Sequence, residues 1–165
     1  MFVIDLPTLT RAAAAERWRE LMPTVPDDMR AEIDQFGELF VSPLPRNHHQ
    51  LIATMIGQQL CQQLGGVAPF GLALNTRIGV RIPDVCWTTS PRKFSEDPAP
   101  TAPEICVEVA SFANTEKWLL EKAAAYLDAG ALEVIIVELD GRIRYFDSDG
   151  ERAVSVHGLQ LRATY

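Results

Sequence analysis

The chain has 165 residues, 47% of them apolar, and a formal net charge of −7. This length predicts one domain, residues 1–165, with a single sizeable core, and the composition excludes collagen-like, coiled-coil and disordered chains. No apolar run approaches the ~20 residues of a membrane span, and no basic segment precedes an apolar one at the N-terminus, so we expect neither a membrane helix nor a signal peptide. The acidic balance argues against strong nonspecific binding to duplex nucleic acid, unless folding assembles a local basic patch.

The three cysteines are an odd number and have no metal-ligand spacing: they are Cys61, Cys86 and Cys106. Reduced thiols in a cytoplasmic protein are the simplest interpretation. We therefore expect a cytoplasmic location and three free thiols, with Cys86 and Cys106 close together on neighbouring strands.

The first third of the chain predicts helices around a hairpin. Residues 8–21 are rich in strong helix formers, so residues 1–28 are expected to form an N-terminal helix, which covers a sheet edge, and a connector. Residues 30–34 and 38–42 predict a β-hairpin. Residues 46–64 predict a long helix with one apolar side, which a pair of glycines then ends.

A proline interrupts the next predicted strands. Residues 67–74 and 77–87 are expected to be two strands joined by a turn at 75–76. Pro83 breaks the alternation of the second strand immediately before Asp84. Proline in a strand marks an edge, an end or a bulge, and bulges often redirect functional side chains.

A long loop follows, because residues 90–102 are rich in proline and polar residues. Loops of this length are either mobile or functional. Since the segment lies between two acidic motifs, an active-site flap is one interpretation and a mobile connection is the other.

Residues 103–138 read as strand, helix, strand. In the first strand, apolar Ile105, Val107 and Val109 alternate with residues that include Glu108. A carboxylate in mid-strand is costly unless its face is wet or holds a partner. The helix ends at a glycine, and the β-branched run 134–137 is typical of a strand covered on both faces. Residues 142–146 and 152–157 predict the last two strands.

Lys122 lies on the apolar stripe of the predicted helix, beside Trp118 and Tyr126. A lysine in such a place commonly extends its ammonium outward along an apolar stem. The alternative is that the ammonium points at Glu108 on the adjacent strand.

These motifs together resemble the Uma-family restriction endonucleases, which belong to the PD-(D/E)XK nuclease superfamily. The order and intervals of Pro-Asp, Val-Glu-Val, Lys, Tyr and Gly carry the resemblance, over roughly residues 32–138. The matching positions are Gly37, Glu38, Leu39, Pro43, His49, Pro83, Asp84, Val107, Glu108, Val109, Ser111, Lys122, Tyr126 and Gly130.

The resemblance implies an α/β fold of restriction-endonuclease-like type, with a mixed β-sheet flanked by helices. Asp84 and Glu108 would be the metal ligands, with the Val109 carbonyl as a further ligand. Two carboxylates on adjacent strands also match the needs of Mg²⁺ (or Mn²⁺), which takes one or two carboxylates and keeps several waters. The superfamily usually places its lysine two residues after the glutamate, where this chain has Ala110. In the Uma-like pattern the lysine comes from the following helix, and Lys122 occupies that place.

Two further positions match the family, Glu38 and His49. Glu38 would hold a water or a second ion, and His49 would contact a phosphate or carry a proton. Each also has a simpler interpretation: Glu38 as an exposed hairpin carboxylate, and His49 as a helix-start residue with a local hydrogen bond. The simpler interpretation of Asp84 is a turn residue, and that of Glu108 is a surface strand position.

The favoured function is a metal-dependent endonuclease that hydrolyses phosphodiester bonds of nucleic acid, with Asp84, Glu108 and Lys122 as catalytic residues. The alternative is a catalytically silent binding or assembly module on the same fold, which the acidic charge and Ala110 favour. A homodimer is a further expectation, because two copies of a small protein would assemble a groove with two sites.

Overall fold

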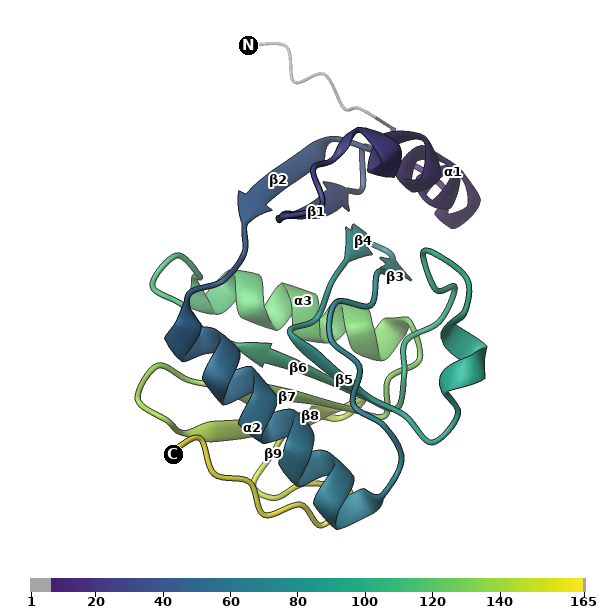
Figure 1. The fold of residues 1–165 in the computed structure, drawn as a ribbon. Helices are drawn as coiled ribbons and strands as arrows, with labels where there is room; N and C mark the ends of the chain where they lie inside the picture. The colour runs from purple at the N-terminus through teal and green to yellow at the C-terminus, as the bar shows by residue number, and fades with distance from the viewer. Residues whose placement is uncertain (1–6, 165) are drawn as a thin grey trace, which may run out of the picture.

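The computed structural model describes residues 7–164, and within them it has two sheets and three α-helices (Figure 1). No helix in this part of the chain is long and apolar enough to cross a membrane. In chain order the elements are α1 Arg11–Leu21, η1 Met22–Thr24, β1 Met29–Asp34, β2 Leu39–Pro43, α2 Asn47–Leu64, β3 Leu74–Thr76, β4 Gly79–Arg81, β5 Val85–Trp87, η2 Pro91–Phe94, β6 Ile105–Val109, α3 Glu116–Asp128, β7 Glu133–Val137, β8 Ile143–Asp147 and β9 Gly150–Arg152.

The larger sheet is mixed and has the strand order β5-β6-β7-β8-β9. Strands β6 and β7 are parallel and α3 connects them, whereas the other neighbours are antiparallel. Val107 and its face of β6 pack against α2, and Cys106 on the opposite face packs against α3. Helices thus cover both faces, which confirms the predicted α/β fold with a mixed sheet flanked by helices.

The smaller sheet is antiparallel, with the order β2-β1-β4-β3. It lies with α1 at the top of Figure 1, above the larger sheet. Helix α1 begins where the Thr10 hydroxyl accepts a hydrogen bond from the Ala13 N–H, 3.1 Å away. Trp18 of α1 packs against Ala31 and Ile33 of β1. The predicted N-terminal helix is therefore present, and residues 1–6 of the predicted N-terminal segment lie outside the described residues.

The prediction of one continuous strand over 77–87 is wrong. The segment forms two short strands, and they belong to different sheets: β4 pairs with β1 and β3, and β5 pairs with β6. Pro83 lies at the break, where its missing N–H leaves the ladder without a donor. The chain crosses from one sheet to the other at this point, which brings Asp84 to the gap between the sheets.

Two other predicted strands are shorter than expected. Of residues 67–74, only Leu74 lies in a strand, and Val67 forms a single bridge with Thr88. Strand β9 ends at Arg152, so most of 152–157 is not a strand. Buried Glu133 instead accepts a hydrogen bond from the backbone N–H of Val156, 2.8 Å away, and this contact holds the last segment against the sheet.

The interpretation of 90–102 as an active-site flap is wrong. The segment joins the end of β5 to the start of β6, whereas Asp84 precedes β5 and Glu108 lies near the end of β6. The segment therefore lies at one end of the antiparallel β5–β6 pair, and Asp84 and Glu108 lie at the other end. The segment is also anchored, because Asp97 accepts a hydrogen bond from Trp18 Nε1, and Ala99 is buried with backbone bonds to its neighbours.

The three cysteines are free thiols, as expected. Cys86 and Cys106 are direct partners in the β5–β6 register, which confirms that they lie close together. Burial, together with the neighbouring Cys86, raises the pKa of the Cys106 thiol well above its ordinary value. Both side chains therefore act as small apolar core residues.

Candidate active site

A cavity of about 700 Å³ lies where the two sheets approach each other. It is lined by β1, the β2–α2 connection, the start of α2, the end of β6 with the loop that follows it, and α3. Asp84, Glu108, Lys122 and His49, which the sequence singled out, all line it. The structure thus brings four of the five predicted site residues together from four different segments.

Glu108 and Lys122 form a buried ion pair. Lys122 Nζ lies 2.7 Å from Glu108 Oε1, and each side chain is 6% exposed. The Tyr126 hydroxyl donates a hydrogen bond of 2.6 Å to the same oxygen. The Lys122 ammonium therefore points at Glu108 rather than outward, and Glu108 is not a surface strand position.

Burial and charge act in opposite directions on this pair. Burial raises the pKa of Glu108, and the positive charge of Lys122 offsets this only in part, so the pKa stays above its usual value. Burial would lower the pKa of Lys122, but the carboxylates of Glu108 and Glu32 raise it above its usual value. Lys122 thus keeps its positive charge in the interior.

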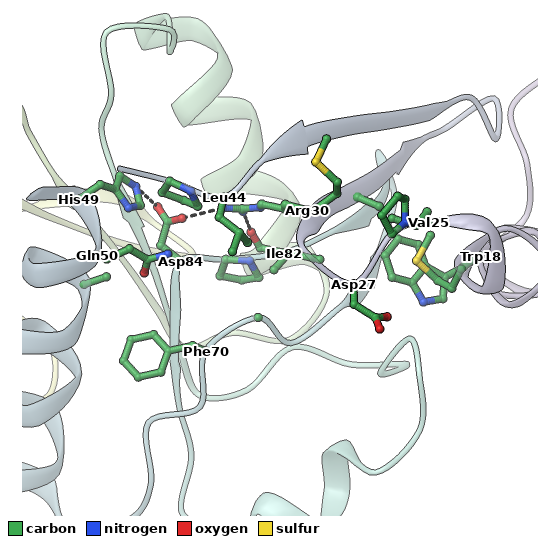
Figure 2. A pocket seen from close by; sticks show the side chains of 18 residues that line it. Trp18, Val25, Asp27, Arg30, Leu44, His49, Gln50, Phe70, Ile82 and Asp84 are labelled. Atoms are coloured by element: carbon green, nitrogen blue, oxygen red, sulfur yellow. Dashed lines mark hydrogen bonds and ion pairs between the residues drawn. The ribbon is translucent and has the colours of Figure 1, made fainter. Parts of the chain in front are cut away.

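Asp84 is held by three donors. Its Oδ1 lies 2.8 Å from Arg30 Nη1, and its Oδ2 accepts a hydrogen bond from the Val109 N–H at 2.7 Å and lies 3.2 Å from His49 Nε2. Figure 2 shows the carboxylate between Arg30 and His49. Burial would raise the pKa of Asp84, but the His49 hydrogen bond and the charge of Arg30 lower it to about 2. Asp84 is therefore ionised and fixed in orientation.

His49 reaches both Asp84 and the end of β6. Its Nε2 lies 3.1 Å from the Val109 carbonyl oxygen as well as near the Asp84 carboxylate. Burial would lower the pKa of His49, but the Asp84 hydrogen bond and charge raise it. His49 thus makes more than a local helix-start contact, because it ties α2 to Asp84 and to the end of β6.

Glu38 lies outside this cavity. It is exposed at the β1–β2 turn, where its backbone N–H bonds to Asp34 Oδ1 at 2.9 Å. Glu32, on strand β1 of the same hairpin, lines the cavity instead. The hairpin therefore supplies a carboxylate to the site, but from mid-strand rather than from the turn.

Two residues of the site, Arg30 and Glu32, were missed by the sequence analysis. Glu32 Oε1 lies 3.5 Å from Lys122 Nζ and 3.6 Å from Arg30 Nη2, and it accepts a hydrogen bond from the Ile82 N–H at 2.8 Å. Burial would raise the pKa of Glu32, but the charges of Lys122 and Arg30 lower it. The alternation of β1 could have predicted them. Its apolar residues Ala31 and Ile33 pack against α1, so Arg30 and Glu32 lie on the opposite face of the strand.

The site is a compensated network of buried and partly buried charges. Its carboxylates are Glu32, Asp84 and Glu108, and its cations are Arg30, Arg81 and Lys122, with Arg81 Nη1 3.3 Å from Glu32 Oε2. Buried charges persist only when they are paired and hydrogen-bonded. Of these cations, Arg30 and Lys122 line the cavity, beside the carboxylates that pair with them.

Carboxylates of the cavity are the donors that a divalent ion would use. In the described part of the chain, no group of three or more His, Cys, Asp or Glu side chains could hold a metal ion. Mg²⁺ takes one or two carboxylates and keeps several waters. Asp84 and Glu108 line the same cavity. The pair therefore fits an ion that keeps most of its waters, but not a fully protein-ligated metal centre.

A family model and solved structures of other proteins are similar to this chain. The model of the Uma2 family, described as "Putative restriction endonuclease", matches residues 15–163. The crystal structure of a putative nuclease belonging to DUF820 from Anabaena variabilis ATCC 29413 is similar, with a TM-score of 0.64 and 15% sequence identity, over 94% of this chain and 95% of that chain. At this identity the similarity concerns the fold alone. No curated protein matches the chain.

Proposed function

Because this chain belongs to the Uma2 family, we propose that it is a metal-dependent endonuclease that hydrolyses phosphodiester bonds of nucleic acid at the cavity around Asp84, Glu108 and Lys122. Family membership supports nuclease function in general. One observation carries the specific proposal: these three residues come from the β4–β5 crossing, β6 and α3, and all three line one cavity. A fold alone would not require this convergence.

Asp84 and Glu108 are the residues that would hold Mg²⁺ or Mn²⁺. When bound, such an ion supplies an activated water at neutral pH and charge neutralisation at the phosphate. The lowered pKa of Asp84 keeps this carboxylate ionised, which is the form that binds a metal ion. The Tyr126 hydroxyl fixes one oxygen of Glu108, and Glu108 lines the cavity.

Lys122 supplies the charge that stabilises the transition state in this proposal. Its ammonium is held between Glu108 and Glu32, at 2.7 and 3.5 Å, so its position is fixed before any substrate binds. A preorganised cation in a partly dry site stabilises developing negative charge more strongly than it does in water. Lys122 also orients the attacking water, in place of the strand lysine that Ala110 replaces.

Arg30 is the second cation at the cavity, and its planar guanidinium suits a phosphate oxygen pair. It is held by Asp84 at 2.8 Å and lies 3.6 Å from Glu32. The three neighbouring carboxylates raise its pKa further, although burial would lower it. Arg30 thus binds and orients the phosphate next to the bond that is cleaved.

The rival function is a catalytically silent binding module, and a specific observation favours it. Each of the three carboxylates at the site already has a protein cation as its partner, in the pairs Arg30–Asp84, Lys122–Glu108 and Arg81–Glu32. A site whose charges are all satisfied internally can persist without an ion. In that case the module would keep the fold and the cation cluster but would not cleave.

A cleavage screen separates the two functions. The purified protein is incubated with single-stranded and double-stranded DNA and RNA, with Mg²⁺, with Mn²⁺ and with a chelator. The endonuclease proposal predicts internal cuts that need the metal and that disappear in Asp84→Asn. Cleavage that survives both the chelator and Asp84→Asn would contradict the proposal, and metal-independent binding without cleavage would support the silent module.

A further inference from the structure

A second cavity, of about 430 Å³, adjoins the candidate active site. Arg30, His49 and Asp84 line both cavities. Figure 2 shows the second cavity extending from this polar group toward Val25 and Trp18. Its volume lies in the range of about 300–1,000 Å³ that small-molecule sites occupy. The proposed cleavage chemistry gives this space no role.

Much of the cavity lining is apolar and partly aromatic. It is formed by Trp18, Met22, Val25, Met29 and Phe70, among others. The hydrogen bond from Trp18 Nε1 to Asp97 Oδ1, at 2.8 Å, holds the indole in place. Phe70 is 49% exposed although its ring is at the cavity. Aromatic faces and flexible thioethers suit a flat, polarisable ligand.

Two solvent-exposed polar side chains also line the cavity. They are Gln50, beside Asp84 in Figure 2, and Asp27, near Val25. A glutamine amide offers both donors and an acceptor, and a carboxylate offers acceptors. A flat ligand with donors and acceptors along its edge would replace the water at both side chains, whereas a purely apolar ligand that displaced this water would leave them without partners at a cost.

We propose that this second cavity binds one nucleobase of the substrate strand, next to the phosphodiester bond that is cleaved. The inference rests on the proposed function. A phosphate bound at Arg30 places the adjoining nucleotide at the shared wall of the two cavities, and an unpaired base has the flat faces and polar edges that the second cavity fits. A base can enter only when it is unpaired, so the substrate is single-stranded or locally opened.

The first test removes the exposed aromatic ring from the cavity. Phe70→Ala is compared with Phe40→Ala, since Phe40 is exposed to nearly the same extent, 51%, and lines neither cavity. Affinity for short single-stranded oligonucleotides is measured by fluorescence anisotropy at one fixed salt concentration. Base–aromatic stacking predicts about 5- to 150-fold weaker binding for Phe70→Ala. Phe40→Ala should stay within about twofold of wild type.

The second test uses oligonucleotides in which one abasic residue is moved along the strand. One abasic position should weaken binding by a similar factor, and at that position Phe70→Ala should have no further effect. This loss of additivity identifies the ring and the base as partners. A wild-type affinity that is unchanged at every abasic position, or a Phe70→Ala that binds like wild type, would overturn the inference.

These readouts separate the inference from the proposed function, because neither needs cleavage. Binding that depends on Phe70 and on one base, without any metal-dependent cleavage, would support the nucleobase site and contradict the endonuclease. Metal-dependent cleavage, together with an affinity that is the same at every abasic position, would support the endonuclease and contradict the nucleobase site. If Phe70→Ala instead converts a dimer to a monomer in light scattering, a second copy of the chain covers the cavity and the inference is wrong.

Discussion

Replacing Lys122 by methionine tests the buried pair most sharply. The change keeps most of the apolar stem but removes the ammonium that lies 2.7 Å from Glu108 Oε1 and 3.5 Å from Glu32 Oε1. From the sequence alone, this variant would be expected to keep wild-type-like stability. The buried pair changes that expectation, because Glu108 would remain in the interior without its cation.

The expected loss follows from the burial of both partners. Breaking a buried ion pair by removing one partner costs about 3–5 kcal/mol. The Tyr126 hydroxyl still donates to Glu108 at 2.6 Å in the variant, so we expect the lower end, about 3 kcal/mol of unfolding free energy near pH 8. A carboxyl whose pKa is raised in the folded state binds a proton on folding, so stability falls as pH rises from its unfolded pKa toward its folded pKa. Because the pKa of Glu108 is raised from 4.5, the loss should be small near that pH and grow above it.

Urea unfolding followed by circular dichroism measures this loss at about pH 5 and about pH 8. Lys117→Met is the matched control, since Lys117 lies on the same helix, is 87% exposed and only pairs weakly with Glu121 at 4.0 Å. The control should lie within about 0.5 kcal/mol of wild type. Adding Glu108→Gln to Lys122→Met removes the uncompensated charge and should recover about 2 kcal/mol.

Two results would refute the reasoning. One is a Lys122→Met protein within about 0.5 kcal/mol of wild type near pH 8, and the other is a double variant no more stable than Lys122→Met. The cleavage rates of wild type and Lys122→Met are measured separately, in conditions where both proteins are folded. There the variant should lose at least about tenfold in cleavage rate, roughly 1.4 kcal/mol of transition-state stabilisation.

The remaining predictions concern Asp84, Tyr126 and assembly. Since the pKa of Asp84 is lowered from 3.8 to about 2, the stability of wild type relative to Asp84→Asn should fall by about 2 kcal/mol as acid is added from about pH 5 to about pH 2 in urea unfolding; a constant difference would refute the lowered pKa. Tyr126→Phe removes a buried hydrogen bond of 2.6 Å to Glu108 and should cost about 1.5–3 kcal/mol in the same assay, whereas a negligible cost would mean that Lys122 alone satisfies that oxygen. Light scattering at micromolar concentration should give twice the monomer mass of 18.3 kDa, and the monomer mass would remove the homodimer.

Local periodicity was enough to predict the central strand and its helix. Alternation along β6 predicted that Val107 and Glu108 lie on opposite faces, because a strand has a side-chain period of two. In the structure, different helices cover these two faces. The order of the motifs then predicted the proximity of Glu108 and Lys122. Both predictions depend on short-range geometry within one β-α-β unit, which sequence carries well.

Long-range packing was not predictable in the same way. The alternation of β1 placed Arg30 and Glu32 on one face, but nothing local shows that this face meets the larger sheet. Pro83 marked a break, yet the break does not show that the chain changes sheets there. The β-branched segment 152–157 reads as a strand, and only the burial of Glu133, a partner distant in sequence, draws it into a different path.

The most direct test of the central claim is the Mg²⁺-dependent cleavage rate of wild type against Glu108→Gln. Glu104→Gln is the matched control, because it is the same substitution just before the same strand, and Glu104 accepts hydrogen bonds from Thr89 outside the cavity. A metal-dependent nuclease site at Glu108 predicts that cleavage rises with Mg²⁺ in wild type and in Glu104→Gln and is abolished in Glu108→Gln at every Mg²⁺ concentration. Equal rates in Glu108→Gln and Glu104→Gln, both folded, would contradict it.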